Sequence, residues 1–336
     1  MKVSLKDLAQ ICGCSVTSVS RALKDSDTIS KELREKVKSK AKELGYVPNL
    51  LAGSMRTGYT NTLAVILPDL RNPYFSLLAK YAEEYATSKG YSVFFMTTNE
   101  ISEHEHDAVM KAMQKNVDGI LLLPNQLDTQ SIDIMNKMNF PYVLFGRIFD
   151  DIKADSVVVN DEMGGYLATK HLIEKGHSRI LFLNSFMHIF SSQARFRGYK
   201  KALKEGGIPF NEEDVKYIST KIGDSEKIVE EIFSKENDYT AIFCYCDVIA
   251  FEAIFRLNKM GYAVPQDIAI ASTDDIHSEI VLPIQLTSVG FDRAEYVKCA
   301  IDTLINNIKH AASPSKKEKE YVQKMIDVKL TVGQTT

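Results

Sequence analysis

The chain has 336 residues and a net charge of −3, and its 45% hydrophobic and 25% charged residues are ordinary for a globular protein with two or three cores. No apolar run approaches the ~20 residues that a membrane-spanning helix needs, and the N-terminal MKVSLKDLAQ lacks the apolar stretch of a secretory signal. Five cysteines, an odd number, favour a reducing compartment over a disulfide framework, so we expect a cytoplasmic protein with no membrane partner.

The first 45 residues predict three short helices around one small core. Ser4, Ser15 and Ser30 are each placed to cap a helix, and Gly13 falls where the chain must turn sharply between the first two. Apolar residues recur at helical spacing: Leu5, Leu8, Ala9, Val19, Ala22, Leu23, Leu33, Val37, Ala41 and Leu44. This pattern is typical of a helix-turn-helix unit.

The second of these helices presents an outer face that suits the major groove of DNA. Val16, Thr17, Ser18, Ser20 and Arg21 offer small hydrogen-bonding groups, one methyl-bearing residue and one arginine. Charge supports this interpretation, because residues 1–60 carry a net charge of +5 and the remaining residues carry −8. A basic head on an acidic body is what phosphate neutralisation needs.

From residue 62 onward, continuous apolar runs alternate with amphipathic helical patterns. The expected strands cover residues 62–68, 91–97, 119–124, 142–145, 156–160, 179–184, 215–219, 241–245 and 267–272. Helices are expected through Met110 and Met113 and over residues 74–89, 132–138, 163–175, 194–205, 225–233 and 248–260. Residues 286–289, 293–308 and 325–330 come last and can supply crossovers or edge strands. The alternation predicts parallel sheets covered on both faces, and its two series suggest two subdomains.

The whole chain resembles the lactose/galactose-repressor (LacI/GalR) family of bacterial transcription regulators. The segments SLKDLAQICGCSVTSVSRAL, ELGYVPN and RTGYTNT carry the resemblance near the N-terminus, and LRNPYFSLLAKYAEE, VDGILLLP, ARFRGYKKAL and VPQDIAIASTDD carry it in the body. It implies an α/β protein: an N-terminal helix-turn-helix three-helix head plus a periplasmic-binding-protein-like core of two doubly wound parallel-sheet subdomains. The expected divisions are 1–46 for the head, 47–61 for a hinge, and 62–336 for an effector-binding and dimerisation domain, with subdomains of 62–160 plus 291–322 and 161–290 plus 323–336.

The resemblance also implies how DNA is bound. Val16, Thr17 and Arg21 are expected to read base edges, while Met55 stands where the family usually wedges a leucine into the minor groove. We expect a homodimer on a near-palindromic double-stranded operator. The expected DNA contacts are Ser4, Ser15, Val16, Thr17, Ser20, Arg21, Asn49, Ala52, Met55 and Arg56.

A small effector is expected in a cleft between the subdomains. Open parallel sheets bind ligands beyond the carboxyl ends of their strands, and Tyr74, Phe75, Arg147 and Asn160 follow predicted strands. The aromatic pair can stack on a sugar ring or a base. The resemblance implies that Arg195 grips effector oxygens and that Asp274 accepts from hydroxyls, although these two can also pair only with each other or with neighbours. The expected effector contacts are Tyr74, Phe75, Arg147, Asn160, Arg195, Cys246, Asp247 and Asp274.

Three departures from the family lie near this cleft. Cys246 stands where the family often has asparagine, Ser272 and Thr273 replace a glycine-aromatic pair, and residues 290–292 read Gly-Phe-Asp in place of glutamine-proline. The effector of a relative therefore cannot be transferred to this chain.

The sequence predicts no enzyme. Cys12 and Cys14, like Cys244 and Cys246, are separated by one residue, whereas zinc sites usually place two to four residues between paired cysteines. The chain contains no G-x-S-x-G, H-E-x-x-H, P-loop or G-x-G-x-x-G. We expect no catalytic residue, metal or cofactor.

These observations favour a repressor of carbohydrate-use genes that responds to a sugar or sugar derivative. A family regulator controlled by a partner phosphoprotein stays open as an alternative. A free sugar-binding receptor is a weaker alternative, because it would need an export signal and no helix-turn-helix.

Overall fold

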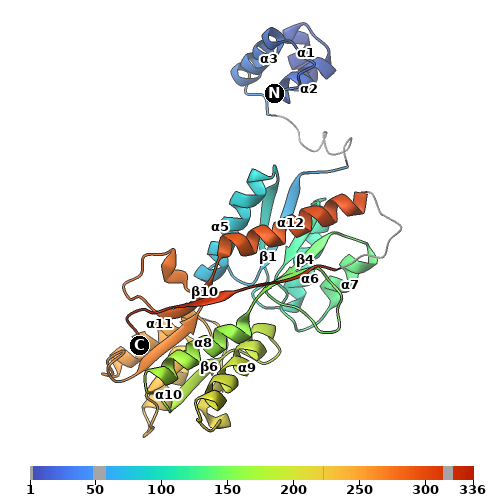
Figure 1. Ribbon diagram of the computed structural model, residues 1–336. Helices are drawn as coiled ribbons and strands as arrows, with labels where there is room; N and C mark the ends of the chain where they lie inside the picture. The colour runs from blue at the N-terminus through green and yellow to red at the C-terminus, as the bar shows by residue number, and fades with distance from the viewer. Residues whose placement is uncertain (1–2, 48–57, 222, 313–320) are drawn as a thin grey trace. The chain divides into compact units, whose positions relative to one another are not determined.

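The computed structural model describes residues 3–47, 58–221, 223–312 and 321–336. The chain divides into two compact units, Met1–Thr60 and Asn61–Thr336 (Figure 1). Four of the expected hinge contacts lie outside the described residues: Asn49, Ala52, Met55 and Arg56.

The N-terminal unit contains the three expected helices, α1 (Leu5–Cys12), α2 (Val16–Leu23) and α3 (Lys31–Glu43). Ser4 starts α1 with a capping box, because its Oγ accepts from the Asp7 N–H at 3.2 Å while the Asp7 carboxylate accepts from the Ser4 N–H at 2.8 Å. Gly13 ends α1 in the left-handed conformation, with a φ of 67°. The core consists of Leu8, Ala9, Cys12, Val19, Ala22, Val37 and Ala41.

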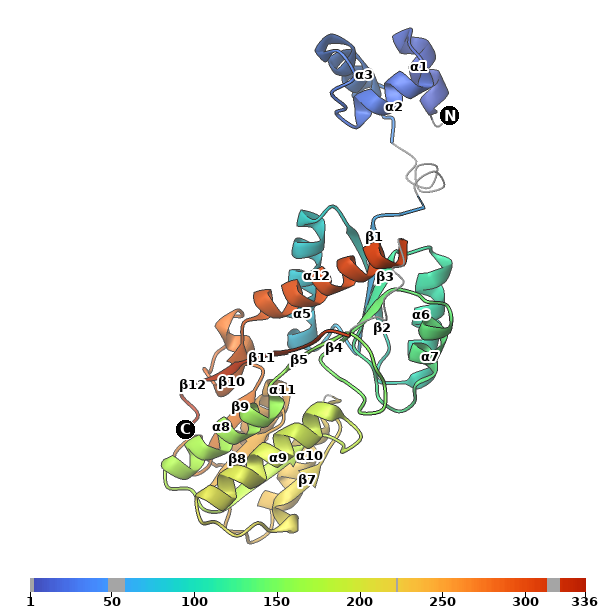
Figure 2. The ribbon, with the colours of Figure 1, turned by 45° about the vertical axis from the view of Figure 1, so that its right-hand side comes forward.

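The second unit has two lobes, each built on a six-stranded sheet (Figure 2). The first lobe orders its strands β11-β5-β4-β3-β1-β2, all parallel. These strands are β1 (Thr62–Leu67), β2 (Ser92–Thr97), β3 (Gly119–Leu122), β4 (Tyr142–Phe145), β5 (Ser156–Val159) and β11 (Gln323–Ile326). Helices α5 (Pro73–Ser88) and α12 (Arg293–Ala312) pack together on one face, and α6 (Ser102–Gln114) and α7 (Gln130–Lys137) cover the other.

The second lobe orders its strands β12-β10-β9-β8-β6-β7. They are β6 (Ile180–Asn184), β7 (Val215–Tyr217), β8 (Ala241–Cys244), β9 (Ala269–Thr273), β10 (Thr287–Phe291) and β12 (Val328–Thr331). Helices α8 (Asp161–Glu174) and α9 (Phe190–Glu205) cover one face, and α10 (Asp224–Phe233) and α11 (Asp247–Lys259) cover the other. Both faces of each sheet are covered, so the central strands are apolar throughout, as the sequence predicts.

The chain crosses between the lobes three times: from β5 to α8, from β10 to α12, and from β11 to β12. The last crossing corrects the expected subdomain boundary. Residues 323–326 do not belong with the second lobe, because β11 pairs with β5 of the first sheet, from Gln323 with Ser156 to Ile326 with Val159. The single segment expected over residues 325–330 is therefore two edge strands, and β12 pairs antiparallel with β10 in otherwise parallel sheets.

Candidate functional site

Helix α2 carries the exposed polar face that the sequence predicts. Its N-cap is Ser15, whose Oγ accepts from the Ser18 N–H at 3.0 Å, while Val19 and Ala22 are buried in the core of the unit. Val16, Thr17 and Arg21 are exposed, and Ser20 is half-buried. The cap and the core fix the helix so that its outer side chains are free to contact another molecule.

A polar cavity lies between the two lobes, beyond the carboxyl ends of strands of both sheets. It brings together six of the eight residues that the sequence predicts: Tyr74, Phe75, Arg147, Arg195, Cys246 and Asp274. Ten further residues complete the lining: Asn72, Glu100, Leu123, Gly146, Val159, Asp161, Ile189, Ser191, Thr220 and Tyr245.

Arg195, on α9, is held by groups of the second lobe. Its Nε donates to Asp161 Oδ1 at 2.8 Å, and its Nη2 lies 2.7 Å from the same oxygen. Its Nη1 donates to the Tyr245 carbonyl, and its guanidinium lies 4.5 Å from the centre of the Tyr245 ring. Asp274 Oδ1 lies farther from Nη2, at 3.8 Å. Asp161 is therefore the main ion-pair partner of this arginine.

Arg147 occupies the corresponding place in the first lobe. Its two terminal nitrogens donate to the two oxygens of Glu100, at 2.8 and 2.6 Å, and Nη1 also donates to the Pro124 carbonyl at 2.8 Å. Glu100 has a φ of 58°, a conformation that side-chain-bearing residues rarely adopt. Each arginine of the cavity is thus paired with a carboxylate of its own lobe.

Asp274 is the third carboxyl group of the cavity, and it lies farther from an arginine than Glu100 and Asp161 do. Burial raises the pKa of Asp274 to about 8, against the opposing effect of Arg195. Its carboxyl group is then mostly protonated at neutral pH, so it can donate a hydrogen bond as well as accept one. The residue has a φ of 110°, which marks a strained backbone at this end of the cavity.

Aromatic rings supply the apolar part of the lining. The rings of Tyr74 and Phe75 meet edge to face with their centres 5.1 Å apart, and Tyr74 also contacts Phe291 at 6.2 Å. Asn72 caps α5 beneath them, because its Oδ1 accepts from the Tyr74 N–H at 3.0 Å. A flat ring face beside paired charges suits a ligand with both apolar and hydrogen-bonding surfaces.

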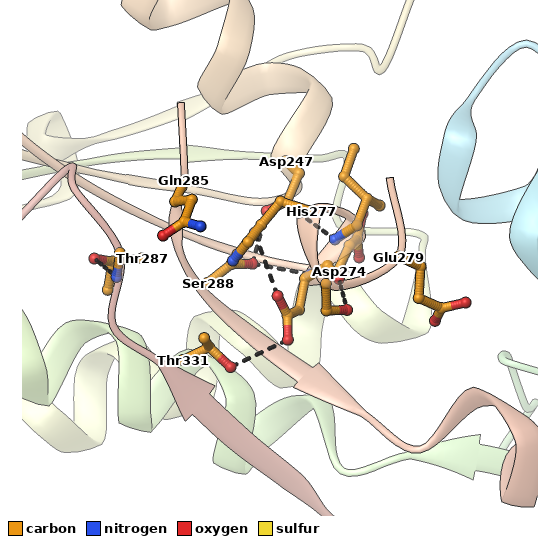
Figure 3. Close-up of polar contacts among 12 residues, drawn as sticks. Asp247, Asp274, His277, Glu279, Gln285, Thr287, Ser288 and Thr331 are labelled. Atoms are coloured by element: carbon orange, nitrogen blue, oxygen red, sulfur yellow. Dashed lines mark hydrogen bonds and ion pairs between the residues drawn. The ribbon is translucent and has the colours of Figure 1, made fainter. Parts of the chain in front are cut away.

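Asp247 is fully buried and does not line the cavity, so the structure does not bring this expected contact to the cavity. Its Oδ1 accepts from the hydroxyls of Ser272 and Ser288, and its Oδ2 accepts from the Ile276 N–H at 2.8 Å. Figure 3 shows Asp247 and Ser288 close together beside the chain that carries Asp274. Thr331 of β12 donates to Asp275 at 3.1 Å in the same network. Asp247 therefore fixes the loop after β9 instead of contacting a ligand.

Asn160 is also absent from the cavity. Its Oδ1 accepts from the Met163 N–H at 3.2 Å and so caps α8, and the side chain lies on a separate hollow with Met163 and Arg197. The neighbouring Asp161 faces the cavity in its place. Sequence reasoning missed Asp161, Glu100 and Tyr245, although each ends a predicted strand or follows one within three residues.

No group of three or more metal-ligating side chains is found in the part of the chain that the structure describes. All five cysteines are free thiols, and Cys12, Cys244 and Cys246 are buried as small apolar side chains. Among the described helices, none is long and apolar enough to cross a membrane.

A helix-turn-helix unit with an exposed polar helix, joined in one chain to a two-lobed domain whose cavity is lined by charged and aromatic side chains, defines a DNA-binding regulator that responds to a small molecule. Comparison with known families agrees. Residues 4–49 match the family described as bacterial regulatory proteins, lacI family, and residues 60–324 match the periplasmic binding proteins and sugar binding domain of LacI family. The chain belongs to the LacI family of bacterial transcription regulators, and this family is regulatory and not enzymatic.

Curated relatives span nearly the whole chain. The chain is 30% identical to the ribose operon repressor of Haemophilus influenzae, over 91% of this chain and 92% of the relative. It is 29% identical to the HTH-type transcriptional repressor PurR of Glaesserella parasuis, over 93% of this chain and 92% of the relative. The resemblance to this family and the expected regulatory function are thereby confirmed.

Solved structures share the fold at lower identity. A Lac repressor dimer bound to operator and the anti-inducer ONPF matches with a TM-score of 0.84 and 22% identity, covering 100% of this chain and 99% of that one. The complex of the transcriptional regulator CelR with cellobiose matches with a TM-score of 0.74 and 24% identity, covering 100% of both chains. These matches confirm the predicted fold class.

Proposed function

We propose that this protein is a cytoplasmic repressor of carbohydrate-use genes that binds near-palindromic operator DNA as a homodimer. The effector is a small, uncharged, sugar-type molecule held in the cavity between the lobes. The single observation that carries the effector class is the pairing of both cavity arginines, Arg147 with Glu100 and Arg195 with Asp161.

The charge of the lining argues for an uncharged effector. Glu100 and Asp161 neutralise the two arginines, and Asp274 is mostly protonated at neutral pH. Among the residues that line the cavity, none therefore carries an unpaired formal charge. A phosphorylated sugar would place its charge against Glu100 and Asp161. Sugar hydroxyls, by contrast, can donate to these carboxylates and accept from the guanidinium groups, while a ring face stacks on Phe75.

A purine base is a second candidate for the same cavity. The edge-to-face pair of Tyr74 and Phe75 supplies a surface on which a planar base can stack, and several curated relatives are named PurR. One relative is named a ribose operon repressor, and a LacI family regulator of similar fold from Enterococcus faecium was solved with bound ribose. We favour the sugar because the lining offers three carboxyl groups as partners for hydroxyls.

For DNA, we propose that Val16, Thr17 and Arg21 read base edges in the major groove, with Ser4, Ser15 and Ser20 near the backbone. The exposure of Val16, Thr17 and Arg21 on α2 supports the base-reading role. Asn49, Ala52, Met55 and Arg56 are proposed to contact the minor groove between two half-sites. An effector that changes the relative pose of the lobes needs to supply only ~1–3 kcal/mol of coupling to alter operator occupancy tenfold or more.

The test combines calorimetry with mobility shift on an operator selected from a random duplex library. The titrants are D-ribose, cellobiose, ribose 5-phosphate, adenine and guanine. We expect an uncharged sugar to bind the wild type and change operator affinity, and Arg195→Ala to lose this response while retaining operator binding.

Arg197→Ala is the matched control. Arg197 lies on the same helix, is half-exposed and pairs with Glu162 at 2.9 Å outside the cavity. This variant should respond as the wild type does. An undiminished response of Arg195→Ala would refute the cavity assignment, and tighter binding of ribose 5-phosphate than of any uncharged sugar would refute the effector class.

A further inference from the structure

Gln126 joins the two lobes with a single side chain. It lies between β3 and α7 in the first lobe, and its Oε1 accepts from the backbone N–H of Phe190 in the second lobe at 2.7 Å. Its Nε2 donates to the carbonyl of Ile148 at 2.6 Å, within the first lobe. No crossover segment contains Gln126 or Phe190, so the contact holds the lobes together at a place where the chain does not connect them.

The direction of this amide is determined by its partners. The Ile148 carbonyl can only accept, so it requires the NH₂ group, and the Phe190 N–H can only donate, so it requires the oxygen. Gln126 has a φ of 65°, an uncommon conformation for a residue with a side chain. The backbone strain is consistent with a residue whose side chain is held in a particular direction.

Phe190 is the first residue of α9, and this helix lacks a cap of its own. The N-cap position is Ile189, which makes no side-chain hydrogen bond to the first turn. The first N–H groups of a helix have no partner inside the helix, and a side chain from elsewhere can satisfy them. Gln126 satisfies one of them from the opposite lobe.

The two segments that Gln126 joins both carry residues that line the cavity. Ile148 follows Arg147 in the chain, and α9 carries Ser191 and Arg195; Arg147, Ser191 and Arg195 all line the cavity. We propose that Gln126 is a positioning residue for effector binding: it caps α9 from the opposite lobe and thereby holds the two arginine-bearing segments at the separation that an effector requires. This inference rests on the proposed function.

The test is hydrogen–deuterium exchange on the full-length protein without any ligand. Gln126→Ala should speed exchange at the start of α9 and also in the segment around Arg147, each by about fivefold or more, because one hydrogen bond of ~1 kcal/mol corresponds to that factor. Gln126→Glu keeps an acceptor for the Phe190 N–H but loses the NH₂ group that the Ile148 carbonyl requires, so it should protect the Phe190 amide better than Gln126→Ala does but less than the wild type. The control is Gln193→Ala, since Gln193 lies on α9 but donates to the Met187 carbonyl within its own lobe.

Two results would overturn the proposal. Exchange at the wild-type rate in Gln126→Ala would show that the contact does not protect α9. Faster exchange confined to the start of α9, with no change around Arg147, would show a local cap without any effect on the lobes. Because the exchange experiment needs no effector, its failure is distinct from a failure of the calorimetric test of the proposed function.

Discussion

The carboxylate of Asp161 and the guanidinium of Arg195 form the shortest ion pair of the cavity's second lobe, with Nε and Nη2 at 2.8 and 2.7 Å from one oxygen. Both residues are buried, at 5% and 8% exposure. Burial raises the pKa of Asp161 above its ordinary value, against the opposing effect of Arg195. The pair therefore holds the guanidinium of Arg195 in a fixed position in the cavity. Removal of either partner would leave the other charge buried without a partner, which lowers the free energy of unfolding.

Removal of the carboxylate should destabilise the second unit strongly. Asp161→Ala leaves Arg195 buried, with the carboxyl group of Asp274 the nearest at 3.8 Å, and we expect a loss of about 3–5 kcal/mol in unfolding free energy. Urea unfolding followed by far-UV circular dichroism measures this loss. Asp238→Ala removes an exposed partner of Arg179 and should cost at most about 1 kcal/mol. Equal losses in both variants would contradict the special role of the buried pair.

The sequence located this region but could not identify the right side chain. Asn160 and Asp161 both follow the strand SVVV, and adjacent residues point in different directions where a strand ends. The start of α8 determines which of the two side chains reaches the cavity, because Asn160 is the N-cap of this helix and Asp161 faces the cavity. Arg195 and Asp274 were predictable because the resemblance marks them. Their partners were less accessible, because the bond of Arg195 to Asp161 joins residues 34 positions apart.

The fold followed from the sequence except at the C-terminal crossing. Apolar runs and helical periods predicted both sheets because buried parallel strands are apolar on both faces. The segment MIDVKL has strand character on both sides of Asp327, but its residues do not predict which of the two sheets each half joins. That choice depends on free edges at β5 and β10, which are properties of the assembled lobes.

Close packing of α8 on α9 depends on Gly165. A Cβ at this position would lie 2.2 Å from the Arg195 carbonyl oxygen, whereas a Cβ at Gly164 would meet nothing nearer than 3.9 Å. Gly165→Ala should therefore push the helices apart and cost roughly 1–3 kcal/mol or more. Gly164→Ala should be neutral or stabilise by up to about 1 kcal/mol, because alanine favours helix. Thermal unfolding of the two variants measures the contrast, and equal midpoints would contradict it.

Arg21 should determine operator preference without affecting the fold of its unit. The side chain is exposed on α2 and takes no part in the core. Arg21→Ala should therefore lower the preference for operator over scrambled duplex by about tenfold or more, since a base-reading arginine contributes roughly 1–3 kcal/mol of discrimination. Lys24→Ala, also exposed, should weaken both duplexes alike. Mobility-shift titrations at one fixed salt concentration compare them, and retained discrimination in Arg21→Ala would place base reading elsewhere.

Glu105 should make stability fall as pH rises. This residue of α6 is 2% exposed, and its Oε2 accepts from the Asn125 N–H at 2.7 Å. Burial raises the pKa of Glu105 from 4.5 to about 7, against hydrogen bonds from Asn125 and Ser131. Between these values the folded protein binds more protons than the unfolded chain, so the stabilising contribution is complete below pH 4.5 and is lost as pH rises through 7.

Glu105→Gln removes the titrating group and keeps an acceptor for the Asn125 N–H. Relative to the wild type, its unfolding free energy should therefore rise by about 2 kcal/mol between pH 5 and pH 8. Taking the difference between variant and wild type at each pH removes the contributions of other buried carboxyls such as Asp274, provided that these sites titrate independently. Glu103→Gln changes an exposed carboxylate on the same helix and should show no such difference. Urea unfolding at the two pH values measures all three proteins. A constant difference between Glu105→Gln and the wild type would mean that Glu105 is already charged in the folded protein at pH 5, held so by its hydrogen bonds despite its burial.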